Sequence, residues 1–291
     1  MFHKMRRLIA AGMGGVLLAV ALSGCASGGD NRTMASGRLD GLDEITVVTR
    51  EEGSGTRSVF AESMGFIDPG TGRDQTLASA VSVNSSQEVV DAVAKDASAI
   101  GYVSAGILSD EQKVHAVTVD GKTLERTFYL AYMGKLTELE QDFITYIKGA
   151  GQKIVAETAK PVHKETSFLS GKPTGRLKVG GSTSVAGMIQ KLADDYMKRN
   201  PNAKIEVVET DSTNGLTGTM EGTYDLGMSS RDLKDYEKEL LSSEAIAKDE
   251  IAVIVQADNP LSNISSADLK NIYTGEVTEW KELDLSAKEE K

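Results

Sequence analysis

The sequence predicts an α/β fold divided into two lobes. Short β-branched runs alternate with amphipathic helical patterns along most of the chain, as expected when helices cover a sheet. About 265 residues follow the N-terminal apolar segment, enough for two separate hydrophobic cores. Residues 164–175, rich in Thr, Ser, Gly and Lys, form the clearest linker between folded parts.

Strands are expected where short runs are rich in apolar and β-branched residues. The candidates are Ile45–Thr49, Ala99–Val103, Val114–Val119, Thr127–Tyr132, Leu177–Val179, Lys204–Glu209 and Ile251–Gln256. Helices are expected over Ser86–Lys95, Glu138–Lys148, Val185–Arg199 and Ala267–Tyr273. Ser85, Thr137 and Ser265 each lie just before or at the start of such a pattern, where a side-chain cap stabilises the first turn.

The N-terminus has the pattern of an export signal, predicted over residues 1–24. Lys4, Arg6 and Arg7 precede an apolar stretch, Leu8–Leu22, that is short for a bilayer span. The sequence Leu-Ser-Gly-Cys that ends at Cys25 resembles a lipobox, so Cys25 is expected to carry a lipid and residues 25–41 to form a flexible tether. The alternative is an ordinary signal peptide with an incidental cysteine. Because Cys25 is the only cysteine, an internal disulfide is excluded.

Charge narrows the classes of partner. The formal net charge of −11 becomes −14 when the three cations of the signal are removed. An acidic body disfavours nucleic acid and anionic lipid surfaces as partners. A small anion stays compatible, because local N–H groups rather than global charge would hold it.

Two short loops carry the strongest functional signal: Gly180–Ser184 and Glu52–Arg57. Each follows a β-branched run and precedes a helix-like stretch. A glycine- and hydroxyl-rich turn between a strand and a helix holds small anions, because free N–H groups and the helix dipole point at the ligand. Two such loops suggest an oxyanion held between two lobes.

Several segments together resemble the substrate-binding proteins of phosphate ABC transporters. The matching segments are Val179–Val185, Asp211–Gly215, Tyr224–Arg231, Ile272–Trp280, Val47–Arg57 and Ala99–Val103. This resemblance implies a type II periplasmic-binding-protein fold, also called a Venus flytrap. In that fold two α/β lobes are joined by two crossing strands, and the ligand binds in the cleft between them.

The order of these segments differs from the order in that family. There the Gly-Ser-Thr loop stands near the mature N-terminus, and the Trp-containing segment runs directly into the Gly-Ser-Gly-Thr segment. Here the segment with Ser54 comes first and the segment with Trp280 comes last, so we expect a circularly permuted member. A fragment of a longer tandem protein is the alternative. Thr127–Tyr132 and Ile251–Gln256 would be the crossing strands, lobe A would comprise residues 42–126 and 256–291, and lobe B residues 127–255.

The resemblance also implies the residues that hold phosphate. By motif, lobe A offers Ser54, Gly55 and Thr56, with Arg50 as the principal cation. Lobe B offers hydroxyls and one further arginine, namely Thr183, Ser184, Ser212, Ser230 and Arg231. Taken singly, each Ser or Thr could be a helix cap, Arg50 could pair with Glu51 or Glu52 at the surface, and Arg231 could be solvated.

One position departs from the family pattern. Many members carry an aspartate where this chain has Ser230, and that carboxylate accepts the proton of monohydrogen phosphate and repels sulfate. Discrimination between phosphate and sulfate is therefore left open. No metal or other cofactor is expected, and the implied partners are phosphate, the permease subunits of the transporter and, through Cys25, the extracytoplasmic face of the cell membrane. A monomer is expected.

Three other function classes were weighed against this one. An exported phosphatase or serine hydrolase is disfavoured, because His115 and His163 are the only histidines after the signal and neither lies in a catalytic or metal-binding motif. A binding protein for another oxyanion, such as sulfate or molybdate, and a surface phosphate sensor or adhesin without a transport role both fit the same loops.

Overall fold

The computed structural model describes residue 39, residues 41–120 and residues 123–283. The predicted signal peptide, most of the tether and Cys25 lie outside the described residues. Within the part of the chain that is described, no helix is both long and apolar enough to span a bilayer.

Strands and helices alternate along the chain. The strands are β1 (Thr46–Arg50), β2 (Val81–Val83), β3 (Ala99–Ser104), β4 (Val114–Val119), β5 (Leu124–Met133), β6 (Lys160–Pro161), β7 (Gly175–Ser182), β8 (Ala203–Thr210), β9 (Leu226–Ser229), β10 (Leu241–Gln256) and β11 (Asn263–Ile264). The helices are α2 (Gly55–Met64), α3 (Ser86–Val93), α4 (Glu138–Lys148), α5 (Gln152–Val155), α6 (Thr183–Arg199), α7 (Ser212–Met220), α8 (Asp235–Lys238) and α9 (Ser266–Thr274), with short 3₁₀ turns η1 (Ala105–Ile107) and η2 (Trp280–Glu282).

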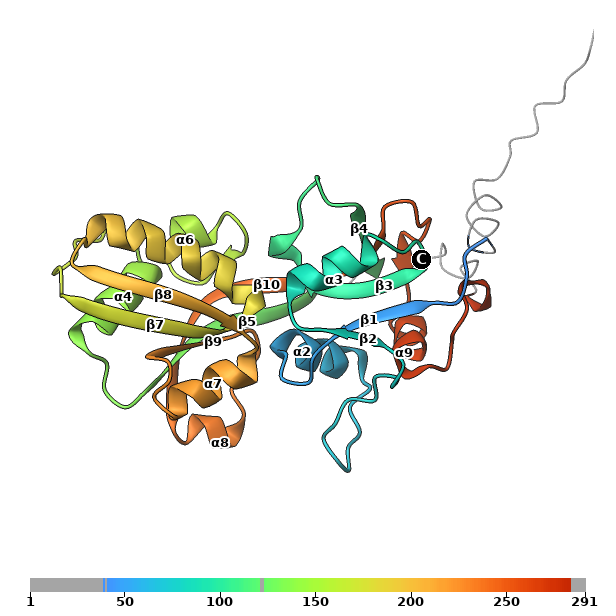
Figure 1. Ribbon diagram of the computed structural model, residues 1–291, viewed down its shortest axis with the longest axis horizontal. Helices are drawn as coiled ribbons and strands as arrows, with labels where there is room; N and C mark the ends of the chain where they lie inside the picture. Colours follow the sequence, from blue (N-terminus) through green and yellow to red (C-terminus); the bar gives the residue numbers. More distant parts are fainter. Residues whose placement is uncertain (1–38, 40, 121–122, 284–291) are drawn as a thin grey trace, which may run out of the picture.

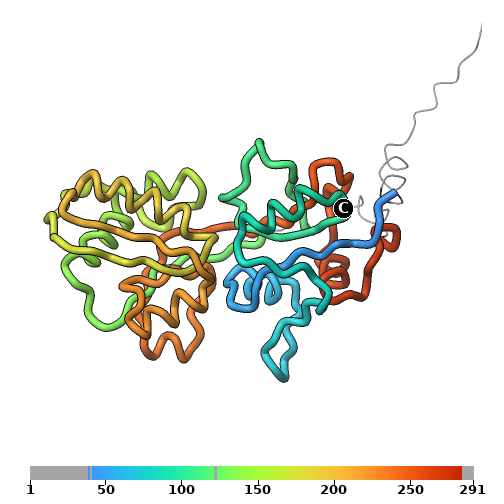
Figure 2. The backbone as a smooth tube through the Cα atoms, viewed as in Figure 1, coloured from blue at the N-terminus to red at the C-terminus, as the bar shows by residue number. Residues whose placement is uncertain are grey.

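Two lobes lie end to end and are joined by β5 and β10 (Figures 1 and 2). The strand order β2-β1-β3-β10-β5-β9-β7-β8 runs through both lobes, and β4 adds to the lobe A end of β10. β5 and β10 pair antiparallel from Leu124/Ile251 to Met133/Leu241, with one irregularity between Ala245 and Ala247. The two-lobed fold with two crossing strands is therefore as the sequence predicts.

Each lobe has buried side chains on both faces of its sheet. In lobe A, α2 and α9 cover one face around Phe60 and Tyr273, while the Val-rich face of α3 covers the other. In lobe B, α4 and α6 cover the larger core around Phe143 and Ile189, and α7 covers a smaller one around Leu216. Both lobes are three-layered, which explains why their central strands read as near-continuous apolar runs.

The second crossing strand is much longer than predicted. β10 spans Leu241–Gln256. The half before Ile251 includes charged residues, of which Lys248 and Glu250 are exposed, and these interrupt the apolar pattern that marks a strand. Ile251, Val253 and Val255 pack in the core of lobe A, so the buried side chains change lobe before the boundary predicted at residue 255. The rest of the predicted division stays a prediction.

The predicted helices and caps are confirmed, with small shifts at their ends. Ser85, Thr137 and Ser265 each accept a hydrogen bond from a backbone N–H in the first turn of α3, α4 and α9. Asp211–Gly215, one of the segments that carry the family resemblance, forms the N-cap and first turn of α7. Glycines at positions 215 and 218 weaken the helical signal there, and tertiary packing against β7 and β9 overrides it.

The two ends of the described chain pack together in lobe A. Ile45 N–H donates to Thr278 O at 2.7 Å, and Glu44 pairs with Glu279 in an isolated antiparallel bridge. Trp280 is fully buried, and its indole N–H donates to Ser98 O at 3.1 Å. Segments at opposite ends of the described chain are therefore neighbours in space, as the predicted lobe A requires.

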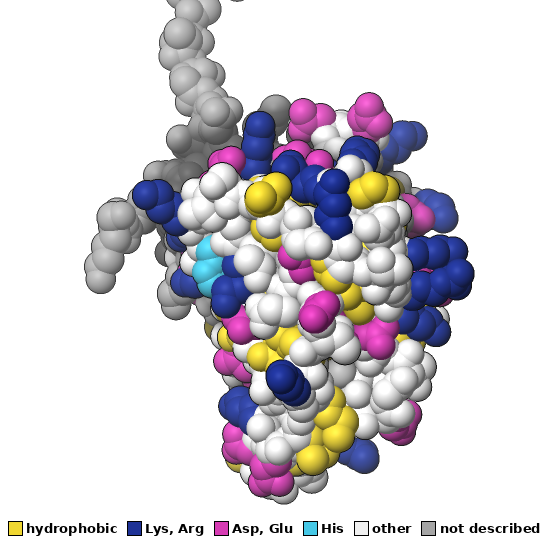
Figure 3. Space-filling view, turned by 90° about the vertical axis from the view of Figure 1, so that its left-hand side faces the viewer, with side chains coloured by type: hydrophobic (Ala, Val, Ile, Leu, Met, Phe, Trp, Pro, Cys, Tyr) yellow, Lys and Arg dark blue, Asp and Glu magenta, His cyan; other side chains and the backbone are white. Residues whose placement is uncertain are grey.

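The outer end of lobe B is seen in Figure 3. Lys and Arg side chains lie among Asp and Glu on the described part of this face, and the apolar areas are small and separate. On the described part of this face the two charge signs are interspersed, unlike the single-sign patch of a nucleic-acid interface.

Candidate functional site

Four helix N-termini meet where lobe A faces lobe B. From lobe A come the starts of α2 (Gly55) and α3 (Ser86), and from lobe B the starts of α6 (Thr183) and α7 (Ser212). A helix N-terminus presents unpaired N–H groups and a partial positive charge, so this convergence favours an anion. Two of the four, α2 and α6, follow the loops that the sequence singled out.

The loop before α6, Gly180–Ser184, is mostly strand. β7 continues through Ser182 in register with β8, and α6 starts at the next residue. Gly181 has φ +140°, and a Cβ atom there would lie 2.3 Å from Met228 O, so only glycine lets β9 pack this closely. The abrupt change from strand to helix directs the Thr183 and Ser184 side chains toward lobe A.

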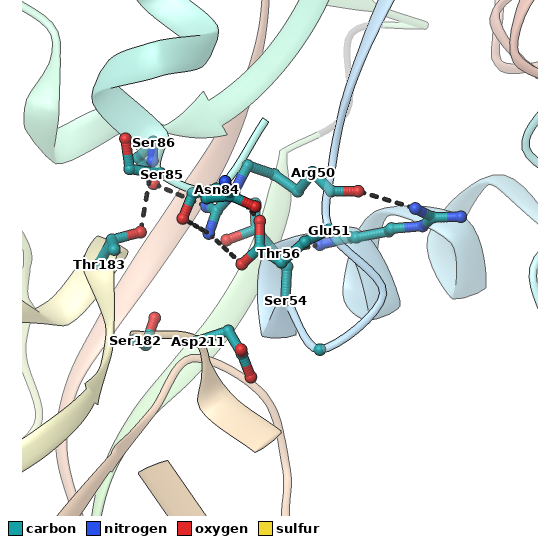
Figure 4. Close-up of polar contacts among 12 residues, drawn as sticks. Arg50, Glu51, Ser54, Thr56, Asn84, Ser85, Ser86, Ser182, Thr183 and Asp211 are labelled. Carbon is teal, nitrogen blue, oxygen red and sulfur yellow. Dashed lines mark hydrogen bonds and ion pairs between the residues drawn. The ribbon is translucent and has the colours of Figure 1, made fainter. Parts of the chain in front are cut away.

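Seven hydroxyl groups gather at this junction, and we call them the hydroxyl cluster: Thr56, Ser86, Ser182, Thr183, Ser184, Ser212 and Ser230. Ser184 Oγ bonds across the cleft to Thr56 Oγ1 at 2.9 Å and to Ser86 Oγ at 3.0 Å. Ser86 N–H also donates to Thr183 Oγ1 at 3.3 Å, as Figure 4 shows. Within lobe B, Ser230 Oγ accepts from Ser182 at 2.9 Å and lies 3.2 Å from Ser212 Oγ. Binding an anion here would exchange these mutual bonds for bonds to the anion.

The lobes touch through glycines as well. A Cβ atom on Gly55 would lie 2.5 Å from Ser212 Oγ and 2.7 Å from Ser230 Oγ. Gly53 O accepts from Thr213 Oγ1 at 3.0 Å and from Thr213 N–H at 3.2 Å. These contacts join the loop before α2 directly to the start of α7, so the structure represents a closed cleft.

Arg50 reaches the hydroxyl cluster at the end of β1. Its side chain is only 2% exposed and forms two bonds to Glu51, of 2.6 and 2.8 Å. Its Nη1 donates to Ser86 Oγ at 3.1 Å and its Nη2 to Asn84 O at 3.3 Å. The pair of Arg50 with Glu51 forms, as one alternative for Arg50 held, but Arg50 itself is buried beside the cluster and the Glu51 side chain is 18% exposed.

A second buried arginine, Arg126, lies on the other side of Thr56. It stands opposite Asp249 in the β5–β10 ladder, and its Nε donates to Asp249 Oδ2 at 2.9 Å. Its Nη1 donates to Thr56 Oγ1 at 2.6 Å, while Ser104 Oγ donates to Asp249 Oδ1 at 2.8 Å. Burial raises the pKa of the Asp249 carboxyl and lowers that of Arg126, and the attraction between the two partly offsets both shifts.

Arg231, which the resemblance implies as a phosphate contact, is held by a carboxylate instead. Both of its Nη atoms donate to Glu237 at 2.8 Å, and this pair is almost completely buried. Its further bonds go to Asp232 O and to Thr213 Oγ1. Burial acts to raise the pKa of the Glu237 carboxyl, but the hydrogen bonds from Arg231 and from Lys234 N–H, together with the attraction of these two cations, hold that pKa below its ordinary value. Arg231 therefore fixes α8 and Thr213 and forms no bond to the hydroxyl cluster.

Cavities flank the hydroxyl cluster on both sides. One, of 910 Å³, is lined by both lobes and by the crossing strand, and Arg126 and Arg231 are among its walls. The other, of 290 Å³, is lined by Ser86, Thr183 and Ser184. The lining of the larger cavity is mixed in charge and includes none of the seven cluster hydroxyls, so we place the candidate site at the cluster and regard the cavities as its approaches.

The structure brings most of the predicted residues together. Thr56, Thr183, Ser184, Ser212 and Ser230 are in the cluster, Arg50 donates to it, and Gly55 lies against it. Ser54 is buried beside it and also caps α2, accepting from Arg57 N–H at 3.4 Å.

Sequence reasoning missed Ser86, Ser182 and Arg126 as site residues. Ser86 was read only as part of a helix start, although a Ser-Ser helix start is the same kind of anion signal as the two loops. The signal for Arg126 was an arginine within an apolar strand pattern, which calls for a buried partner.

Comparison with known proteins adds to this geometry. A family profile described as the PBP superfamily domain matches residues 40–174 and again residues 167–291. The chain belongs to the PBP superfamily. Phosphate-binding protein PstS 2 of Streptococcus pneumoniae (strain ATCC BAA-334 / TIGR4) is 36% identical over 284 residues, which are 92% of this chain and 97% of that protein. The crystal structure of a phosphate-binding protein of a phosphate ABC transporter from S. pneumoniae TIGR4 matches with a TM-score of 0.66 and 37% identity, covering 83% of this chain and 100% of the other.

Another relative bears on the order of the segments. Phosphate-binding protein PstS of Bacillus subtilis (strain 168) is 33% identical over 133 residues, only 44% of each chain. A match that stops near half of both chains, together with the double match to the family profile, is what a circular permutation predicts. The permuted order relative to such members stays a prediction, whereas the pneumococcal relative aligns along almost its whole length.

Proposed function

We propose that this protein binds inorganic phosphate in the cleft between its lobes and delivers it to the permease of an ABC transporter. One observation carries the proposal: four helix N-termini and seven hydroxyls converge across the cleft in a chain whose relatives are named as phosphate-binding proteins. The proposed protein is a transport component and not an enzyme.

The chemistry of the cluster suits a tetrahedral oxyanion. Phosphate offers four oxygens, and a closed cleft must supply donors to most of their lone pairs. Hydroxyls and helix N-terminal N–H groups supply many donors in a small volume, and Arg50 adds a charged fork at one side. We propose Arg50, Ser54, Gly55, Thr56, Thr183, Ser184, Ser212 and Ser230 as contacts, and Arg231 as an indirect support through Thr213.

A hydrolase reading has little support at this site. His115 and His163 bond the backbone carbonyls of Leu261 and Ala245, each at 2.8 Å, and neither bonds a cluster hydroxyl. Within the described residues no group of three or more His, Cys, Asp or Glu side chains could hold a metal. Among the described residues, no histidine is therefore bonded to a cluster hydroxyl as a general base would be.

The cellular setting is part of the proposal. We infer that the body works outside the cytoplasmic membrane as a monomer, held by a lipid on Cys25, and docks on permease subunits. A flexible tether over residues 25–41 would let the closed body reach the permease while it stays anchored. We also propose the division into lobe A and lobe B, which is supported by the separate clusters of buried side chains on either side of the crossing at β5 and β10.

Calorimetric titration of the purified protein with phosphate, sulfate and molybdate tests the function. We expect phosphate to bind most tightly. Because Ser230 replaces the carboxylate found in many relatives, we expect weaker rejection of sulfate than aspartate-bearing relatives achieve. Tighter binding of sulfate or molybdate would reassign the protein to another oxyanion. If a strain that lacks the protein takes up phosphate as well as the wild-type strain does, a sensor or adhesin is favoured instead.

A further inference from the structure

Two arginine–carboxylate pairs flank the hydroxyl cluster in the same manner. Arg50 pairs with Glu51 and donates through Nη1 to Ser86 Oγ. Arg126 pairs with Asp249 and donates through Nη1 to Thr56 Oγ1. Each arginine thus touches one lobe A hydroxyl, and both hydroxyls bond Ser184 Oγ of lobe B. The sequence signal and the family resemblance account for Arg50 but not for Arg126.

The bond from Arg126 constrains the proton of Thr56. Arginine is only a donor, so Thr56 Oγ1 must accept the 2.6 Å bond, and its own proton is left to point into the cleft. Ser86 is constrained by Arg50 in the same sense. A hydroxyl that accepts from a charged donor is polarised and becomes a better donor itself. Both lobe A hydroxyls are therefore turned into donors toward whatever occupies the cleft.

Arg126 is held by groups outside the ligand loops. Its side chain is 1% exposed, as is that of Asp249, and Ser104 secures the far oxygen of the carboxylate. Its Nη2 lies 2.8 Å from Asp249 Oδ2 yet makes no hydrogen bond. Asp249 neutralises most of its charge, so its effect on an anion acts through direction rather than through a long-range field. The crossing strands thus place a rigid fork against Thr56.

We propose that Arg126 is a positioning residue of the anion site, fixing the Thr56 hydroxyl as a donor toward the bound anion. This rests on the proposed function for the site. The crossing strands are then more than a hinge, because they contribute a group on which binding depends. A site whose hydroxyls are held as donors favours oxygens that carry lone pairs and no proton, such as the unprotonated oxygens of monohydrogen phosphate.

Variants at both ends of the bond test the proposal by titration with inorganic phosphate. Lysine has one point-like ammonium, so Arg126→Lys can keep the pair with Asp249 but not also the bond to Thr56. We expect Arg126→Lys and Thr56→Val each to weaken phosphate binding at least about tenfold. Because both changes remove the same interaction, the double variant should lose no more affinity than the single variant with the larger loss. Arg199→Lys, an exposed arginine on α6, is the matched control and should bind as the wild type does.

Thermal unfolding without phosphate separates positioning from damage to the fold. If Arg126→Lys unfolds far below the wild type, the charge-free pair Arg126→Gln with Asp249→Asn replaces it, and the same loss of affinity is expected. Binding within twofold of the wild type in a folded Arg126 variant would overturn the proposal, as would losses that multiply in the double variant. If the wild type binds sulfate or molybdate instead of phosphate, the proposed function is wrong, and the same variants then test the role of Arg126 by titration with that anion. If the wild type binds none of the three anions, both the proposed function and the role of Arg126 are overturned.

Discussion

Gly55→Ala should weaken phosphate binding without harming the folded lobes. The backbone at Gly55 is not in the left-handed region, and alanine is favoured over glycine in a helix, so the ligand-free protein should unfold no more easily. The cleft, however, has no room for a methyl group. Its carbon would lie 2.5 Å from Ser212 Oγ and 2.7 Å from Ser230 Oγ.

The size of the effect follows from the bonds that the methyl group displaces. Reaching the 3.0 Å that real Cβ contacts need requires at least a further 0.5 Å from Ser212 Oγ, that is 3.0 − 2.5 Å. Separating the lobes by this amount lengthens the bond from Thr213 Oγ1 to Gly53 O from 3.0 Å to its limit, and rotating the serines instead breaks their bonds to each other. Losing two such bonds costs about 1–3 kcal/mol, which lowers affinity between about fivefold and a hundredfold.

Calorimetric titration with phosphate measures the expected loss of affinity, and thermal unfolding without phosphate measures the stability of the ligand-free protein. Gly187→Ala is the matched control, because a Cβ there meets nothing within 4 Å and lies in the second turn of α6 on lobe B. The control should bind phosphate as the wild type does. Phosphate affinity of Gly55→Ala within twofold of the wild type would refute the close approach of the lobes in the ligand-bound state.

Four further variants have expected outcomes. Arg50→Ala should weaken phosphate binding about tenfold to a hundredfold in titration. Arg231→Ala should instead leave the Glu237 carboxylate buried without its cation and cost about 3 kcal/mol of stability in denaturant unfolding. A larger loss of phosphate affinity in Arg231→Ala than in Arg50→Ala would mean that the site lies elsewhere. The pKa of Glu237 is held below its ordinary value of 4.5, so its contribution to stability is present above that value and is lost as pH falls through the lower, folded-state pKa. Glu237→Gln should therefore reduce the fall of the unfolding temperature at acidic pH, and an unchanged fall would contradict this. Cys25→Ser should release the protein from membranes in fractionation, because the acidic body has little affinity for lipid; retention would indicate another anchor.

Local signals in the sequence determined the elements and half of the site. Cap residues such as Thr137 and Ser265 fix helix starts within one turn, and β-branched runs mark strands that are buried on both faces, because both effects act between neighbours in the chain. The two glycine loops predicted anion-binding helix starts for the same reason. Segment resemblance then supplied the two-lobed fold.

Only the tertiary structure decided which groups meet. The length of β10 depends on pairing with β5 from one lobe to the other, and its charged half has no strand signal of its own. Arg126 reaches Thr56 across 70 residues because Asp249 holds it in the crossing ladder, and Arg231 is drawn away from the cluster by Glu237. A buried arginine goes where its carboxylate partner lies, since an unpaired buried charge is too costly, and a sequence names the arginine without naming that partner.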